Sequence, residues 1–423
     1  MIYTIFAPEK LVGQAMLPAS KSISNRALVL HALAGGQMND IHNLSDCDDT
    51  KVMIRALSEK NPETVDILAA GTAMRFLTAY FAATPSNCII TGTERMLQRP
   101  IGVLVEALRS LGADIEYTEK EGYPPLRIRG KALRGGSLLL PGNVSSQYIS
   151  ALLMIAPTLK EGLKITLTGK IISRPYLNLT LQLMHEFGAE AEWSGEAELT
   201  VKPKPYQAIS YFVENDWSAA SYWYQMVALS TSESEITLQG LQAKSFQGDS
   251  KVAELFEQLG VKTTFSNELE DSLQGGTLKL IQTGEVCSRM DYDFINQPDL
   301  AQTFVVTCAL LNIPFHFTGL QSLKIKETDR IAALIAEMKK LGYSLSEAND
   351  SELFWNGERC EASFADDAIA TYKDHRMAMA FAPATLRIPF LQINDPGVVS
   401  KSYPTYWEAL IRLGFRIEAK SIR

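Results

Sequence analysis

The chain has 423 residues, of which 46% are hydrophobic, enough to bury the cores of roughly two or three ordinary domains. Its 48 acidic and 40 basic residues leave a formal net charge of -8, which argues against a protein that follows nucleic-acid backbones. The five scattered cysteines form neither a zinc-binding spacing nor a disulfide framework, so we expect core residues in a reducing compartment. Residues 1–10 lack the apolar core of a signal peptide, and the apolar runs fall short of the ~18 residues of a membrane span. We therefore expect a cytoplasmic protein that binds neither nucleic acid nor membrane.

One helical pattern recurs six times along the chain. After a start signal, each copy continues as about a dozen mostly apolar residues rich in Ala, Ser and Met. Apolar character nearly all round the helix predicts that these helices are buried. Their predicted starts are Ser20, Gly71, Ser145, Asp216, Pro298 and Asp374.

A short strand and a second helix are expected after most copies. The strands are predicted at Cys88–Gly92, Ile165–Gly169, Glu235–Gly240, Phe315–Gly319 and Phe390–Asn394. Glycine adopts the left-handed cap that ends a helix, so five second helices are predicted to stop at Leu111-Gly112, Phe187-Gly188, Leu259-Gly260, Leu341-Gly342 and Leu413-Gly414. The first repeat is shorter, and its second helix is predicted at Asp48–Ser58 without a glycine stop.

The repeats predict an α/β protein with three units in each half. We place the first domain at residues 19–215, and the second at residues 1–18 together with 216–423, with hinge segments near 17–20 and 211–217. A solenoid used as a scaffold is the alternative that the period alone leaves open. It is disfavoured because the copies share a buried helix and differ in the polar residues at its N-terminus.

Cations occupy equivalent positions of successive repeats. Helix N-termini attract phosphate and carboxylate groups, and here they carry side-chain donors as well. The donors at these starts and in the loops before the second helices include Lys21, Ser22, Arg26, Thr72, Arg75, Ser145, Ser146, Gln147, His375, Arg376, Arg95, Arg99, Ser173, Arg174, Tyr176, Lys324, Lys326, Arg330 and Lys401. Each alone is compatible with a helix cap or a solvated charge. Together they predict small substrates that carry phosphate and carboxylate groups.

Two carboxylates, Asp299 and Glu327, lie among these cations. Either one alone reads as a helix cap, but together with the cations they are candidates for general acid and base. The sequence has no GxxxxGK[ST] loop, no GxGxxG motif after a strand and no pair of acidic runs for magnesium, which disfavours ATP chemistry.

Nine segments resemble, in order, the signatures of the 5-enolpyruvylshikimate-3-phosphate (EPSP) synthase family: LPASKSISNRALVL, AAGTAMRFL, RMLQRPI, GNVSSQYISALLM, SRPY, QPDLAQT, LKIKETDRIAA, DHRMAMAF and VVSKSYPTYWE. The resemblance runs from Leu17 to Glu408. It implies two similar domains, each of three βαβαββ units with buried helices and outer sheets, an inside-out α/β barrel that closes on substrate.

The resemblance also implies a monomeric transferase of the shikimate pathway, in chorismate and aromatic amino-acid biosynthesis. It moves the enolpyruvyl group of phosphoenolpyruvate to the 5-hydroxyl of shikimate 3-phosphate, without metal or cofactor. Shikimate 3-phosphate is then expected on Ser22, Arg26, Ser145, Ser146, Gln147, Ser173, Tyr176, Asp299 and Lys326. Phosphoenolpyruvate is expected on Lys21, Gly71, Arg99, Gln147, Arg330, Arg376 and Lys401. The implied catalytic residues are Asp299 as base, Glu327 as acid, Lys21 and Lys401.

Three features depart from the family pattern. Ala70 stands where Asn is usual, Phe76 stands where Pro is frequent, and the segment from Ser58 to Leu68 is short. Two alternatives remain: a UDP-N-acetylglucosamine enolpyruvyl transferase and a non-catalytic anion-binding scaffold of the same fold. The first generally has a Lys-Asn pair where this chain has Lys21-Ser22, and the second would not need both Asp299 and Glu327.

Overall fold

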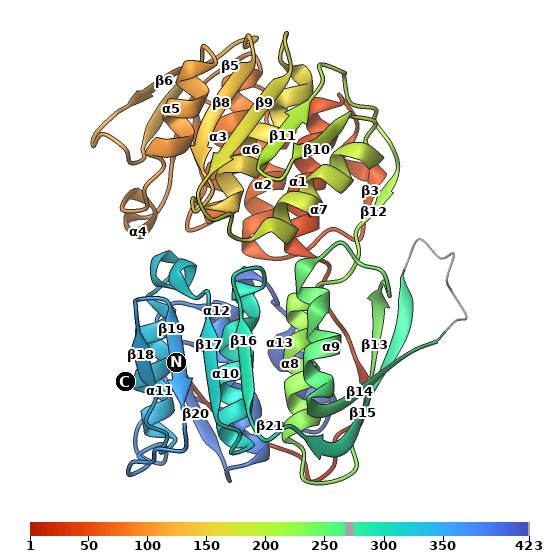
Figure 1. The fold of residues 1–423 in the computed structure, drawn as a ribbon, viewed down its shortest axis with the longest axis vertical. Coiled ribbons are helices and arrows are strands. Elements are labelled where there is room, and N and C mark those ends of the chain that lie inside the picture. Colours follow the sequence, from red (N-terminus) through yellow and green to blue (C-terminus); the bar gives the residue numbers. More distant parts are fainter. Residues whose placement is uncertain (267–274, 422–423) are drawn as a thin grey trace. The chain divides into compact units, whose positions relative to one another are not determined.

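A computed structural model describes residues 1–266 and 275–421. They form two compact units. The continuous unit is Ala19–Val213, and the split unit consists of Met1–Pro18 with the described part of Glu214–Arg423. Each unit is a mixed α/β structure in which sheets surround a helical interior (Figure 1).

The continuous unit has these described elements. The helices are α1 (Lys21–Leu33), α2 (Asp48–Ser58), α3 (Gly71–Ala83), α4 (Glu94–Leu97), α5 (Gly102–Ser110), α6 (Ser146–Ile155) and α7 (Arg174–Glu186). The strands are β3 (Ile41–His42), β4 (Thr64–Asp66), β5 (Ser86–Thr91), β6 (Asp114–Tyr117), β7 (Leu126–Gly130), β8 (Gly136–Pro141), β9 (Leu163–Thr168), β10 (Ala191–Gly195), β11 (Glu198–Val201) and β12 (Tyr211–Phe212).

The split unit contains a second set. Its helices are α8 (Trp217–Leu229), α9 (Val252–Glu257), α10 (Ala301–Leu310), α11 (Arg330–Lys340), α12 (His375–Phe381) and α13 (Tyr406–Arg412). Its strands are β1 (Ile2–Phe6), β2 (Val12–Ala15), β13 (Glu235–Leu241), β14 (Leu259–Ser266), β15 (Gly276–Val286), β16 (Met290–Asp293), β17 (Phe315–Thr318), β18 (Ser346–Ala348), β19 (Glu352–Trp355), β20 (Leu391–Asn394) and β21 (Arg416–Lys420).

The sheets follow one plan. Their strand orders are β4-β5-β7-β6, β10-β11-β9-β8 and β12-β3 in the continuous unit, and β14-β15-β13-β2, β16-β17-β19-β18 and β20-β1-β21 in the split unit. Strands β4 and β5, β8 and β9, and β16 and β17 pair in parallel, and a buried helix joins each pair. Parallel neighbours need such a crossover. The strands at the start of the chain pair with distant segments, β1 with β20 and β21, and β2 with β13.

The predicted buried helices are confirmed. Ser20, Ser145, Asp216 and Asp374 accept a hydrogen bond from a backbone N–H in the first turn of their helices. Such caps satisfy donors that have no partner within the helix, so they fix where each helix begins. The helix predicted at Asp48–Ser58 is α2, with the same bounds.

One predicted glycine stop is wrong. Helix α9 ends at Glu257, and Leu259 and Gly260 already belong to strand β14. Gly260 has a φ of +80°, and the pairing of β14 with β15 shifts its register between Leu259 and Val261. The glycine therefore accommodates an irregularity at the start of a long strand instead of a helix cap.

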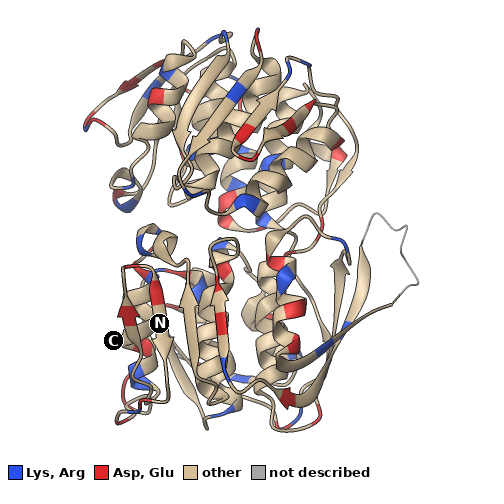
Figure 2. Ribbon diagram, viewed as in Figure 1, with Lys and Arg blue, Asp and Glu red and all other residues tan. Residues whose placement is uncertain are grey.

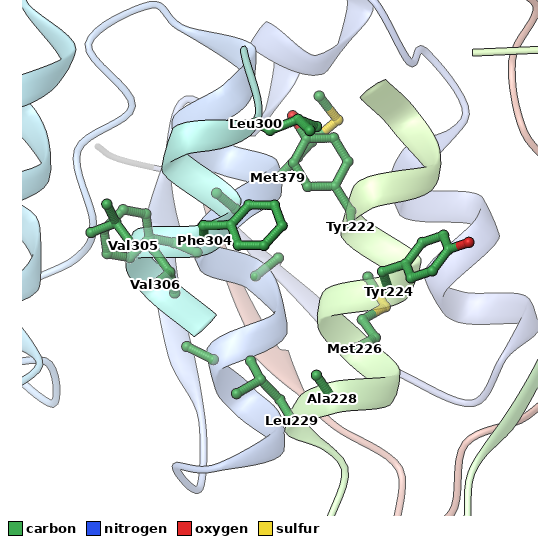
Figure 3. Close-up of a cluster of buried hydrophobic side chains, with 14 of the residues drawn as sticks. Tyr222, Tyr224, Met226, Ala228, Leu229, Leu300, Phe304, Val305, Val306 and Met379 are labelled. Atoms are coloured by element: carbon green, nitrogen blue, oxygen red, sulfur yellow. The ribbon is translucent and has the colours of Figure 1, made fainter. Parts of the chain in front are cut away.

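The helical interior of the split unit explains the apolar pattern. Figure 3 shows Tyr222 and Met226 of α8, Phe304 of α10 and Met379 of α12 gathered in one buried cluster. Because these helices are covered from several sides, they lack the polar face that a surface helix shows.

The shortened first repeat has a small outer layer. Strand β3 has two residues and pairs in parallel with β12, and after α2 the chain proceeds to β4, which belongs to the next sheet. Within the described residues, no helix combines the length and apolar character that a membrane crossing requires.

Candidate active site

Arg26, on α1, is a cation with only 2% of its surface exposed. Its Nη1 donates to the Ser22 carbonyl oxygen at 2.9 Å, and its Nε donates to Thr180 Oγ1 at 2.8 Å. Its Nη2 donates to Ser150 Oγ at 3.3 Å. Burial lowers the pKa of Arg26 to about 10, and nearby Tyr176 opposes this change. Because these hydrogen-bond acceptors are neutral, the buried positive charge favours an anionic ligand.

The N-termini of α3 and α6 are joined by a side-chain contact. Gln147 Nε2 donates to Thr72 Oγ1 at 3.1 Å, and the Gln147 backbone N–H donates to Ser145 Oγ at 3.4 Å. Ser146 is the first residue of α6. Ser173, which precedes α7, has a left-handed φ of 54°. Two helix N-termini with hydroxyl and amide groups therefore lie together, an arrangement that suits phosphate.

Gly71 and Arg99 are in close contact. A Cβ atom at Gly71 would lie 2.5 Å from Arg99 Nη1. Arg75 Nη1 donates to the Gly71 carbonyl oxygen at 2.9 Å, which fixes the start of α3. Because glycine has no Cβ atom, position 71 provides the space that the Arg99 guanidinium occupies.

Lys21 is at the start of α1, and its Nζ lies 3.5 Å from Asp49 Oδ2.

In the split unit, one guanidinium holds three carboxylates. Arg330 is 1% exposed, and its Nη1 and Nη2 lie 3.0 Å from Asp299 Oδ1 and Glu327 Oε2. Its Nε lies 2.6 Å from Asp374 Oδ2, and Arg376 Nη2 lies 3.0 Å from Asp299 Oδ2. We call these five residues the Asp299 cluster. Figure 2 shows that acidic and basic residues lie close together at the end of the split unit where α8 begins.

Burial and the neighbouring carboxylates have opposite effects on the pKa of Arg330 in the Asp299 cluster. Burial lowers the pKa of the Arg330 guanidinium, but Asp374, Glu327 and Asp299 outweigh this effect, so the net shift is upward. Lys326 Nζ lies 3.6 Å from Asp299 Oδ1. Three carboxylates thus face three cations within the split unit. Asp374 is fully buried, whereas the side chains of Asp299 and Glu327 are 17% and 23% exposed, so these two carboxylates can meet a substrate.

The comparison with known proteins decides the family. The EPSP synthase (3-phosphoshikimate 1-carboxyvinyltransferase) family model matches residues 5–61 and 57–410. The chain belongs to the EPSP synthase family. A relative named 3-phosphoshikimate 1-carboxyvinyltransferase from Bacteroides fragilis (strain YCH46) is 60% identical over 418 residues, covering 99% of both chains. Another of that name, from Pseudoalteromonas translucida (strain TAC 125), is 37% identical over 424 residues, covering 94% of this chain and 96% of the relative.

Solved structures agree on the fold. An EPSP synthase from Acinetobacter baumannii has a TM-score of 0.78 and 20% identity, and the match covers 99% of this chain and 100% of that one. A second structure from the same organism has a TM-score of 0.77 at 20% identity, with 100% coverage of both. The family, the transferase class and the two-domain inside-out α/β fold predicted from the sequence are confirmed.

The structure brings together many predicted site residues of this EPSP synthase family member, within each unit. Asp299, Glu327, Arg330 and Arg376 share the Asp299 cluster, while Lys401 Nζ instead donates to the Lys373 carbonyl oxygen at 2.9 Å. Phe76 is buried on α3, and Arg26 Cζ lies 5.3 Å from its ring centroid, so this departure supplies a cation–π contact.

Two carboxylates near the site were missed by sequence reasoning. Asp374 was expected only to start a helix, yet it also binds Arg330. Asp249 lies in the short helix η3 (Gly248–Lys251), is 3% exposed and accepts a hydrogen bond from Ser218. Burial, and next the Asp299 charge, raise the pKa of Asp249 to about 7. The signal for Asp249 was its repeat position: it precedes a second helix, where other repeats carry cations.

We expect Asp249→Asn to stabilise the protein at neutral pH. The pKa of Asp249 rises from its ordinary value of 3.8 to about 7, so between these values the folded state binds a proton that the unfolded state lacks. The contribution of Asp249 to the free energy of unfolding therefore falls as pH rises through this window, by roughly 1 kcal/mol per pH unit. Urea unfolding of both proteins from pH 4 to 8 should show that the free energy of unfolding of the variant increases relative to that of wild type as pH rises. A constant difference across the window would contradict this prediction.

Proposed function

We propose that the chain transfers the enolpyruvyl group of phosphoenolpyruvate to the 5-hydroxyl of shikimate 3-phosphate and releases phosphate. The observation that carries this proposal is the Asp299 cluster. Two partly exposed carboxylates, Asp299 and Glu327, bind the two terminal nitrogens of the Arg330 guanidinium at 3.0 Å each. A planar guanidinium holds such partners in a fixed relation, as a paired acid and base require.

The reaction needs both carboxylates at once. Asp299 takes the proton of the attacking hydroxyl, and Glu327 gives a proton to the methylene carbon of phosphoenolpyruvate. That protonation makes the neighbouring carbon electron-poor, so the hydroxyl oxygen bonds to it. In the second step Glu327, now a carboxylate, takes a proton back from the methyl group as the C–O bond to phosphate breaks. The hydroxyl proton held by Asp299 leaves with the phosphate. Cations that neutralise the phosphate and carboxylate groups stabilise the developing charge.

We propose the substrate contacts residue by residue. Shikimate 3-phosphate is held by Ser22, Arg26, Ser145, Ser146, Gln147, Ser173, Tyr176, Asp299 and Lys326. Phosphoenolpyruvate is held by Lys21, Gly71, Arg99, Gln147, Arg330, Arg376 and Lys401, and Lys401 assists the departure of phosphate. The buried charge of Arg26 and the joined N-termini of α3 and α6 support this assignment.

Phosphate release tests the proposed function. The protein is mixed with phosphoenolpyruvate and either shikimate 3-phosphate, UDP-N-acetylglucosamine or no acceptor. We expect rapid phosphate release in the mixture with shikimate 3-phosphate and in neither of the other two mixtures. Release only with the UDP-sugar would establish the alternative transferase, and no release in any mixture would indicate a scaffold.

Four other expectations stay predictions: the cytoplasmic location, the monomeric state, activity without metal or cofactor, and the domain boundaries with their hinges. Sedimentation velocity tests the monomeric state.

We expect Gly71→Ala to weaken the binding of phosphoenolpyruvate without destabilising the fold. The new methyl group collides with the Arg99 guanidinium, the mobile end of a long side chain, so Arg99 moves and α3 remains. Since a charge-assisted contact is lost, the KM for phosphoenolpyruvate should rise about tenfold. Gly102→Ala is the matched control, because its Cβ would meet its nearest atom at an ordinary 3.4 Å. Equal KM values for the two variants would remove Arg99 from this role.

A further inference from the structure

The segment just before α12 has a strained backbone. Tyr372 and Lys373 have φ values of 54° and 57°, so two successive residues other than glycine lie in the left-handed region. Side chains with a Cβ atom rarely adopt this conformation, which persists only where surrounding contacts impose it. Here the Asp374 backbone N–H donates to the Thr371 carbonyl oxygen at 2.8 Å, which closes a turn over the pair, and further contacts come from α11.

Glu337 of α11 holds this segment from inside the protein. It is 1% exposed, and its Oε1 accepts a hydrogen bond from the Tyr372 hydroxyl at 2.7 Å. Its Oε2 accepts from the Ala370 backbone N–H at 3.0 Å. Lys340 Nζ lies 2.8 Å from the same Oε2 and donates to the Ala368 carbonyl oxygen at 2.9 Å. The last turn of α11 therefore fixes residues 368–372.

The strained pair leads directly into groups of the proposed site. The Lys373 carbonyl oxygen accepts the hydrogen bond of Lys401 Nζ at 2.9 Å. The next residue, Asp374, binds Arg330 and accepts a hydrogen bond from the Arg376 backbone N–H at 2.9 Å. Arg330 starts α11, and Glu337 follows it by seven residues, or about two turns, on the same side of the helix. One helix thus holds this segment at two points.

We propose that Glu337 is a positioning residue, which acts through Tyr372 to place Arg376 and Lys401 for phosphoenolpyruvate. This role rests on the proposed function. Without the Glu337 contacts, the left-handed pair relaxes, and both the Lys373 carbonyl and the start of α12 shift. The effect falls on phosphoenolpyruvate, because none of the residues that this segment places is assigned to shikimate 3-phosphate alone.

The test compares Glu337→Gln and Tyr372→Phe with wild type. The first keeps the size of the side chain. The second removes the hydroxyl of a residue that is 39% exposed, so it preserves the test if the first variant does not fold. In each folded variant we expect the KM for phosphoenolpyruvate to rise about tenfold, the scale of a lost hydrogen bond to a charged group. The Kd of shikimate 3-phosphate, from calorimetry, should stay within about twofold of wild type.

The control is Tyr224→Phe, which removes a buried hydroxyl hydrogen bond of 2.9 Å to Thr263 in the same unit. This variant should change neither the KM for phosphoenolpyruvate nor the Kd of shikimate 3-phosphate. Unchanged phosphoenolpyruvate KM values, or equal losses for both substrates, in an enzyme whose wild type releases phosphate would overturn the positioning role alone. Failure of wild type to release phosphate would instead refute the proposed function.

Discussion

Glu327→Gln is expected to lower turnover about 10²- to 10⁴-fold, the usual contribution of a general acid or base. The amide cannot give a proton to the methylene carbon, yet its oxygen still accepts the hydrogen bond from Arg330 Nη2, now 3.0 Å from Glu327 Oε2. The Asp299 cluster therefore keeps its geometry while it loses the acid. Steady-state phosphate release measures the loss, and calorimetry should show the affinity for shikimate 3-phosphate nearly unchanged.

Glu347→Gln is the matched control for this variant. Glu347 is a partly exposed carboxylate of the same unit, 2.5 Å from Lys324 Nζ, with no assigned role in the reaction. Its turnover should equal that of wild type. If Glu327→Gln turns over at a similar rate, the proton comes from another group, and the pairing of Asp299 and Glu327 on Arg330 has a purely structural purpose.

Helix positions were readable from the sequence because local contacts fix them. Ser20, Asp216 and Asp374 cap their own helices through the next few residues, so the start of each helix is encoded within one turn. The stop at Gly260 was not readable in this way. A glycine with positive φ serves a helix cap and a strand irregularity equally well, and the pairing of β14 with the later strand β15 selects the second.

The sequence predicted some of the residues of the site but not all of them. The motifs around Asp299, Glu327 and Arg376 predicted residues that the fold brings together, although Asp374 and Arg330 are 44 residues apart in sequence. A local pattern cannot show that the Asp374 carboxylate, besides capping α12, pairs with Arg330. The same holds for Asp249, whose proximity to Asp299 arises only when η3 packs against the helices of the split unit.

Arg330→Met is expected to destabilise the split unit strongly. The variant keeps a long apolar side chain but leaves Asp374, which is fully buried, without its partner at 2.6 Å, and removes a contact from both Asp299 and Glu327. Removal of one member of a buried ion pair costs about 3 to 5 kcal/mol, because the remaining charge stays desolvated. For a unit of this size, that corresponds to a fall in Tm of roughly 6 to 20 °C. Scanning calorimetry of wild type and variant measures it.

Two further variants separate burial of charge from loss of an ion pair as such. Lys324→Met also removes a cation with two carboxylate partners, Glu347 and Asp350, but these contacts lie at the surface, so its Tm should stay close to wild type. Asp374→Asn, added to Arg330→Met, removes the stranded charge and should recover part of the lost stability. If Arg330→Met and Lys324→Met unfold at the same temperature, or if the added Asp374→Asn lowers the Tm further, the buried charge of Asp374 is not what Arg330 stabilises.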